Sequence, residues 1–260
     1  MKPIRAAALA VTALPAGMLS TSVNAEYLYG FSNIQLNHLD WTKSTENKTE
    51  QRDFTYIRLE GGSGYSWGEL YGFLDLENPT KSSGRTVRAR HEDGRVNDGR
   101  RVAMKGNARV NIGDTGFNLF GQIFDISGQK FDEQNRFYGF GYNLVGRNFF
   151  FKPFLAAHHA QSTYFNGSNG YVLGWTASYD FSAINQKFTL FNWHETEFSR
   201  DKEYLRVNNK SEKTGHNGAL ELWWHATDSI TAGLQYRYAS DKLGYAENQD
   251  GVIYSLKYNF

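Results

Sequence analysis

Residues 252–260 read VIYSLKYNF, a stretch in which large apolar side chains alternate with smaller or polar ones. One face carries Val252, Tyr254, Leu256, Tyr258 and Phe260, whereas Lys257 and Asn259 fall on the opposite face. A period of two residues is the period of a β-strand, and about ten residues suffice for a tilted strand to cross a bilayer. The stretch therefore predicts a membrane-spanning strand, and its aromatic last residue resembles the ending of bacterial outer-membrane barrels.

The same alternation recurs along the chain. It is clear at 55–60, 69–76, 171–181 and 230–238, and weaker at 31–41, 102–112, 117–126, 137–144, 149–159, 187–196 and 217–226. Together with the last stretch, these segments make about twelve strands, and single-chain bacterial barrels have even strand numbers. We expect an all-β protein, a transmembrane up-and-down antiparallel β-barrel.

The connections alternate between short and long. The short ones are 113–116, 145–147, 182–186 and 227–229, and the long polar ones are 43–52, 77–100, 127–136, 161–170, 197–215 and 240–250. Short periplasmic turns and long external loops are typical of outer-membrane barrels. A soluble β-sandwich, the alternative that composition leaves open, has no reason to sort its loops in this way.

The N-terminus predicts export. Lys2 and Arg5 precede a weakly apolar run from Ala6 to Leu19, and Val23-Asn24-Ala25 resembles a signal-peptidase site. We expect residues 1–25 to be a signal peptide and residues 26–260 to form one barrel domain. The alternative is a tail that is helical or disordered.

Composition narrows the function further. The chain has no cysteine, so disulfides and thiol chemistry are excluded. When Lys2 and Arg5 of the expected signal peptide are left out, the chain has 26 basic and 27 acidic residues. This balance gives no electrostatic reason to expect nucleic acid as a partner. Beyond the signal there is no long apolar segment, which excludes a transmembrane helix. A mean hydropathy of −0.58 agrees with strands of which every second residue faces a polar lumen.

The inward positions of the strands give the chemistry of the lumen. Its charges are mixed, six basic and five acidic: Arg58, Glu60, Glu69, Asp75, Lys105, Arg109, Lys152, Glu195, Glu221, Arg237 and Lys257. Aromatic rings lie between them, and stacking on such rings suits a neutral solute with an aromatic ring and a sugar. The candidate solute-binding residues are Tyr56, Arg58, Glu60, Tyr71, Phe73, Asp75, Lys105, Arg109, Trp193 and Glu221. A bulge that shifts the register would instead turn several of these aromatics, with Phe120 and Phe124 among them, toward lipid.

Two segments carry a family resemblance. Tyr56-Ile57-Arg58-Leu59-Glu60 with Gly61-Gly62, followed by Leu70-Tyr71-Gly72-Phe73-Leu74-Asp75, resembles paired strands of the Tsx/OmpK family of nucleoside-specific outer-membrane channels. Tyr138-Gly139-Phe140-Gly141, Trp175 before Tyr179-Asp180-Phe181, and the ending Tyr258-Asn259-Phe260 fit later blocks less specifically. The resemblance implies a monomeric twelve-stranded barrel in the bacterial outer membrane that passes nucleosides and deoxynucleosides. Arg58 stands where the family commonly has Glu.

Three other classes remain for comparison. An outer-membrane phospholipase would need a His-x-Ser pair, which no histidine of this chain provides, and a barrel protease lacks a supporting motif. A porin for acidic oligosaccharides would need a lumen dominated by Arg and Lys. A closed barrel would act through its surface loops. We expect no enzyme activity, no cofactor and no metal.

The expected partners are a small solute, the lipid bilayer, lipopolysaccharide, and the outer-membrane assembly machinery through Phe260. Phages or colicins are further candidates at the external loops. The basic segment 78–101 has three interpretations: contact with lipopolysaccharide phosphates, a loop folded into the mouth, or a solvated external loop, which we favour.

Overall fold

A computed structural model describes residues 25–81, 99–128, 132–208 and 210–260. Within this part of the chain, twelve long strands and one two-residue strand form a single antiparallel sheet that closes on itself. The strands pair with their sequence neighbours, and β1 pairs with β13 to close the barrel. The long strands are β1 (Tyr27–Trp41), β2 (Phe54–Tyr65), β3 (Gly68–Glu77), β4 (Arg101–Asn111), β5 (Phe117–Ser127), β6 (Asp132–Tyr142), β8 (Phe149–Ser162), β9 (Asn166–Ala183), β10 (Gln186–Phe198), β11 (Gly215–His225), β12 (Ile230–Ser240) and β13 (Gln249–Asn259).

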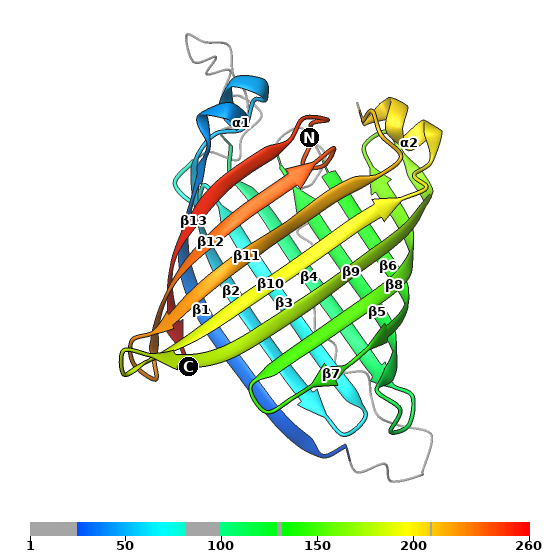
Figure 1. The fold of residues 1–260 in the computed structure, drawn as a ribbon. Coiled ribbons are helices and arrows are strands. Elements are labelled where there is room, and N and C mark those ends of the chain that lie inside the picture. The colour runs from blue at the N-terminus through cyan, green and yellow to red at the C-terminus, as the bar shows by residue number, and fades with distance from the viewer. Residues whose placement is uncertain (1–24, 82–98, 129–131, 209) are drawn as a thin grey trace, which may run out of the picture.

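The two ends of the barrel differ as the loop pattern predicts. Tight turns join the strands at one end, whereas the helices α1 (Lys43–Lys48) and α2 (Lys202–Val207) lie at the other (Figure 1). The β9–β10 turn is Ile184-Asn185, both with positive φ, the conformation of a two-residue type I′ hairpin. Both helices begin at a capping side chain, Thr42 for α1 and Asp201 for α2. Neither helix was predicted, because each is six residues long within a segment expected to be loop.

The predicted barrel and strand number are confirmed, but two predicted loops are wrong in extent. The connection expected at 161–170 is strand over most of its length, since β8 runs to Ser162 and β9 starts at Asn166. The connection expected at 127–136 is shorter in the structure, because β5 ends at Ser127 and β6 starts at Asp132. Polar residues form strand here because ladder hydrogen bonds continue above the apolar belt, where alternation of hydrophobicity is no longer needed. The turn expected at 145–147 overlaps the short strand β7 (Leu144–Val145) at its first residue.

The burial of the strands is inverted relative to a soluble protein. On β1, Asn33, Gln35 and Asn37 are almost fully buried, whereas Leu36 is 54% exposed. The exposed outer positions carry Leu, Val, Ile and aromatic side chains around the barrel. An apolar outer wall and a polar interior are what a strand in lipid requires. In the described segments, no helix is long and apolar enough to cross a membrane.

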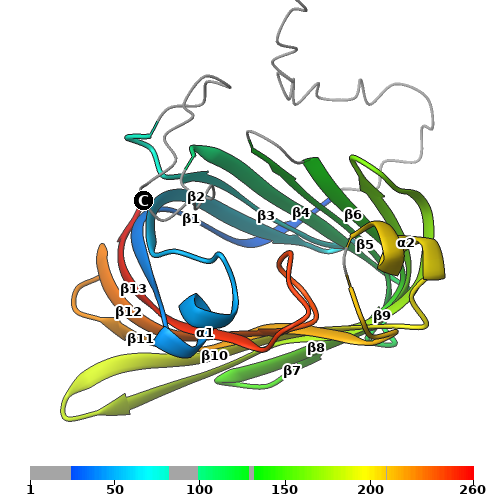
Figure 2. The ribbon, with the colours of Figure 1, turned by 90° about the horizontal axis from the view of Figure 1, so that it is seen from above.

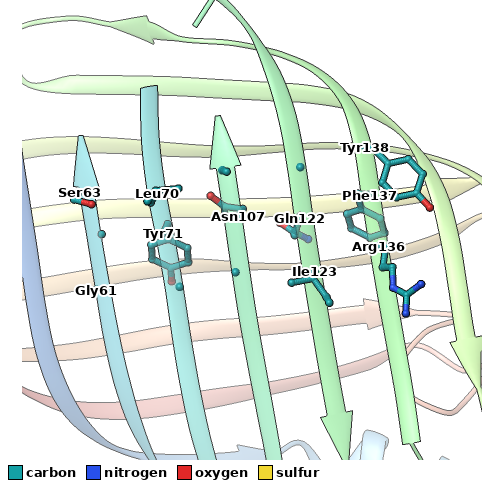
Figure 3. A pocket seen from close by; sticks show the side chains of 15 residues that line it. Gly61, Ser63, Leu70, Tyr71, Asn107, Gln122, Ile123, Arg136, Phe137 and Tyr138 are labelled. Atoms are coloured by element: carbon teal, nitrogen blue, oxygen red, sulfur yellow. The ribbon is translucent and has the colours of Figure 1, made fainter. Parts of the chain in front are cut away.

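A shallow groove crosses the outer wall on β2 to β6. Its labelled residues include Gly61, Leu70, Ile123 and Tyr138, with Arg136 at the β6 side (Figure 3). Gly61 and Gly72 pair directly, and so do Gly72 and Gly106, so a row of positions without side chains forms the floor. This groove belongs to the lipid-facing wall and is not part of the lumen.

Two predicted segments fall largely outside the described residues. These are the signal peptide, expected at residues 1–25, and the middle of the basic segment 78–101.

Candidate functional site

The lumen is the candidate functional site, and the strand register sets what faces it. Arg58 pairs with Asp75, and Phe73 pairs with both Glu60 and Lys105, so these side chains share one face of the sheet. That face is the inner one, because the alternate residues Leu59 and Leu74 are 50% and 45% exposed on the outer wall. The same phasing on the remaining strands places all ten candidate residues inside: Tyr56, Arg58, Glu60, Tyr71, Phe73, Asp75, Lys105, Arg109, Trp193 and Glu221. Their role in binding a solute stays a prediction.

Arg58 is held by two neighbours on the next strand. Its Nε donates to Asp75 Oδ1 at 2.7 Å and its Nη2 donates to Asp75 Oδ2 at 2.8 Å. The guanidinium carbon also lies 4.0 Å from the centroid of the Phe73 ring. A bidentate pair that stacks on an aromatic ring is a rigid arrangement. Arg58 and Asp75 therefore present a fixed surface, and one face of Phe73 is already covered.

Glu60 collects hydrogen bonds from three side chains. Its carboxylate accepts from Tyr71 Oη at 2.6 Å, from Gln35 Nε2 at 2.7 Å and from Asn33 Nδ2 at 3.1 Å. Lys257 Nζ lies 3.6 Å from the same carboxylate. Most of the hydrogen-bonding capacity of Glu60 is thus used within the wall, which fixes the Tyr71 ring in place.

Trp223 and Lys257 extend this surface toward β11 and β13. Lys257 Nζ lies 4.0 Å from the Trp223 ring centroid, and Trp223 Nε1 donates to Glu221 at 2.8 Å. Trp223 was not among the candidates. The signal was present in the sequence, because Trp223 lies two residues after the candidate Glu221 and so shares its inward face of β11.

A second set of contacts joins strands that are far apart in the sheet order. Lys105 Nζ on β4 lies 3.0 Å from Glu195 Oε1 on β10, and Gln122 Nε2 on β5 donates to the same oxygen at 2.9 Å. Trp193 lies beside this contact, with Lys105 Nζ 5.3 Å and the Arg237 guanidinium carbon 4.8 Å from its ring. The two walls of the barrel therefore touch through charged side chains.

A similar contact lies nearer the tight-turn end. Glu69 on β3 forms ion pairs with Arg109 on β4, at 3.5 Å, and with Lys152 on β8. Arg109 also donates to two backbone carbonyls of β8, Lys152 O at 2.9 Å and Pro153 O at 3.3 Å. Arg109 is thus engaged by both walls.

Phenylalanine side chains fill the lumen beside β5, β6 and β8. Phe120 stacks on Phe154 with ring centroids 4.1 Å apart, and Phe137 lies 6.4 Å from Phe154. All three are buried, together with Ala156 and Val172. The register thus turns Phe120 inward, as the phasing predicted, where it packs on neighbouring rings.

A buried ionic cluster, formed by Glu197, Arg200, Asp241 and Lys242, lies at the end of the barrel that carries the helices. Arg200 Nε lies 2.9 Å from Glu197 Oε2, and Arg200 Nη1 lies 2.8 Å from Asp241 Oδ2. Lys242 pairs with Glu197 as well. The cluster ties the loops after β10 and β12 together over the opening, where Figure 2 shows the latter loop reaching inward. Sequence reasoning missed it because all four residues lie in the predicted loops 197–215 and 240–250, which carry no motif; in the structure Glu197 lies near the end of β10.

Lys210 belongs to the same loop after β10. Its Nζ donates to the Tyr245 carbonyl at 3.1 Å, and burial lowers the pKa of its ammonium to about 8. Among the described residues, no group of three or more His, Asp or Glu side chains could hold a metal ion.

These features define the class of protein. A closed antiparallel barrel with an apolar outer wall and a charged, aromatic lumen is an outer-membrane channel. The model of the family described as "Nucleoside-specific channel-forming protein, Tsx" matches residues 36–260. The chain belongs to this family, as the resemblance implied, and its place is the bacterial outer membrane.

A solved porin structure shares the fold. The NanC porin superposes with a TM-score of 0.53 at 11% identity, covering 87% of this chain and 100% of that one. The KdgM porin in complex with disordered oligogalacturonate gives 0.46 at 8% identity, over 89% and 99%. The outer-membrane channel DcaP of Acinetobacter baumannii gives 0.41 at 11% identity, over 93% and 99%.

Proposed function

We propose that this channel passes nucleosides and deoxynucleosides, or similar small solutes that join an aromatic ring to a sugar, by facilitated diffusion. The observation that carries the proposal is the family match over residues 36–260. The lumen supports it, since fixed aromatic rings such as Phe73 and Trp223 lie beside charged groups. The proposal includes no catalysis, cofactor or metal.

Selection would arise from several weak contacts in series. A base would lie against the exposed part of Tyr71, Phe73 or Trp223, since stacking is worth about 1–3 kcal/mol per base. Because Arg58 and Asp75 are paired with each other and Glu60 is bound to Tyr71, Gln35 and Asn33, the sugar hydroxyls would exchange bonds with groups that have capacity left. Asn37 Nδ2 and Trp41 Nε1 are two donors without a partner among the described residues, but both atoms are buried, so a solute would have to displace neighbouring side chains to reach them. Contacts of this strength select a solute without trapping it.

The surface partners are also part of the proposal. Phe260 is 76% exposed at the end of β13, where the outer-membrane assembly machinery could recognise it. Lipopolysaccharide would contact the outer wall and the external loops, and phages or colicins would use the same loops. The protein would act as a monomer.

Flux through purified protein in liposomes tests the channel proposal. Nucleosides are compared with size-matched neutral sugars and with uronate oligomers. We expect saturable nucleoside entry at low concentration and little uronate entry, because acidic and basic groups in the lumen pair with each other. Preferential uronate flux would assign the protein to the acidic-oligosaccharide porins. Absence of all flux would identify a closed barrel that acts through its loops.

A further inference from the structure

The cross-lumen contacts divide the strands of the barrel into two unequal groups. Going around the sheet from β4 to β10 in one direction passes β5, β6, β8 and β9, and in the other direction it passes β3, β2, β1, β13, β12 and β11. The Lys105–Glu195 ion pair joins β4 to β10 and so spans the lumen between these groups. We call the side of β5, β6, β8 and β9 the narrow sector and the other side the wide sector.

A second brace crosses the lumen at another level and ends within the narrow sector. The ion pair between Glu69 and Lys152 joins β3 to β8, and Arg109 on β4 donates to the β8 carbonyls. The first brace thus runs from β4 to β10, at the border of the narrow sector, and the second runs from β3 and β4 to β8, within it. Because each is an ion pair or a charge-assisted hydrogen bond, each is stronger than a neutral contact.

Packed side chains fill the narrow sector between the braces. Phe120, Phe137 and Phe154 are 2–5% exposed, and Ala156 and Val172 are 2% and 0% exposed. Ring centroids 4.1 Å apart leave no room for a solute between Phe120 and Phe154. The wide sector has a packed cluster of its own, Leu39, Trp41, Tyr56 and Ile253, toward the end of the barrel that carries the helices. Farther from that end, the inward side chains of Arg58, Lys257 and Ser255 are only partly buried.

We infer that the braces divide the lumen lengthwise, so that the solute passes only through the wide sector. Lys105 and Glu195 then limit the size of the solute that can pass. In this arrangement the ion pair between Lys105 and Glu195 forms part of the boundary between the two sectors. The solute passes along this boundary, so the two residues are specificity-determining residues. The inference rests on the channel function of the family and does not depend on nucleoside selectivity.

The absence of cysteine from the whole chain provides a direct test. Single variants Ser255→Cys in the wide sector and Ala156→Cys in the narrow sector are made, and each folded barrel is placed in a planar bilayer. A cationic, water-soluble methanethiosulfonate reagent is added while the conductance and the labelled mass are recorded. Both substitutions are small, and heat-modifiable migration on gels checks that each barrel has folded.

We expect Ser255→Cys to be labelled and its conductance to fall, whereas Ala156→Cys stays unlabelled with unchanged conductance. Adding Lys105→Met and Phe154→Ala to Ala156→Cys removes one brace and part of the packing, so labelling should then appear. Labelling of Ala156→Cys alone at a rate within about threefold of Ser255→Cys would overturn the inference. Labelling of neither position with conductance intact would also overturn it, whereas a folded protein without conductance would contradict the channel function itself.

Discussion

Removing the aromatic surface of β3 should weaken solute selection by an amount that the structure limits. The change is Tyr71→Ala together with Phe73→Ala. Stacking is worth about 1–3 kcal/mol per base, but the Arg58 guanidinium covers one face of Phe73 at 4.0 Å. Only the other face can meet a solute, so about 1–2 kcal/mol should be lost. That loss corresponds to a rise of about 5- to 30-fold in the half-saturating nucleoside concentration.

The assay is nucleoside entry into liposomes over a range of concentrations. Phe140→Ala is the matched control, because Phe140 is 62% exposed on the lipid-facing wall and should not change saturation. Phe73→Leu keeps an apolar side chain but lacks a ring, so it separates stacking from volume. If the double variant had the same half-saturating concentration as the parent protein, the proposed role of these rings would be wrong.

Four further changes test other parts of the molecule. Lys105→Met removes the charged contact to Glu195 and should raise single-channel conductance and admit larger neutral sugars; unchanged conductance would argue against the cross-lumen brace. Arg200→Gln leaves the buried acids of the mouth cluster with fewer partners, so external protease should cut the loop after β10 faster on intact cells. Burial lowers the pKa of Lys210 to about 8 from 10.5, so the folded loop binds fewer protons than the unfolded loop between these values. Its resistance to subtilisin should therefore rise as the pH increases from 8 to 10.5, and Lys210→Met should abolish that rise. Phe260→Ser should lower the amount of folded barrel in the outer membrane while leaving refolding in detergent unchanged.

The sequence predicted the barrel because its controlling pattern is local. Alternation in a stretch such as 252–260 follows from one face meeting lipid and the other meeting the lumen, and each strand carries that pattern by itself. The inward direction of Arg58 and Lys105 followed for the same reason. Strand ends were predicted less well, since β8 and β9 continue through polar residues at 161–170 where the alternation stops.

The partners of the lumen residues could not be predicted. Lys105 and Glu195 lie 90 residues apart, and their contact depends on how the closed sheet is shaped in cross-section, which no single strand encodes. The mouth cluster poses the same difficulty, because Arg200 and Asp241 come from different loops. Phasing showed which side chains point inward, but not that most of the charged ones would be paired.

This pairing changes how the mixed lumen should be understood. Counting charges suggested free ionic groups that would meet a solute, yet Arg58 is bound to Asp75, Lys105 to Glu195, and Glu69 to Arg109 and Lys152. An ion that entered would have to break such pairs, whereas a neutral ring and its hydroxyls could use the aromatic faces and unpaired amides without doing so. The charged residues thus act mainly by fixing the shape of the lumen, and neutral solutes of limited width are the ones this shape favours.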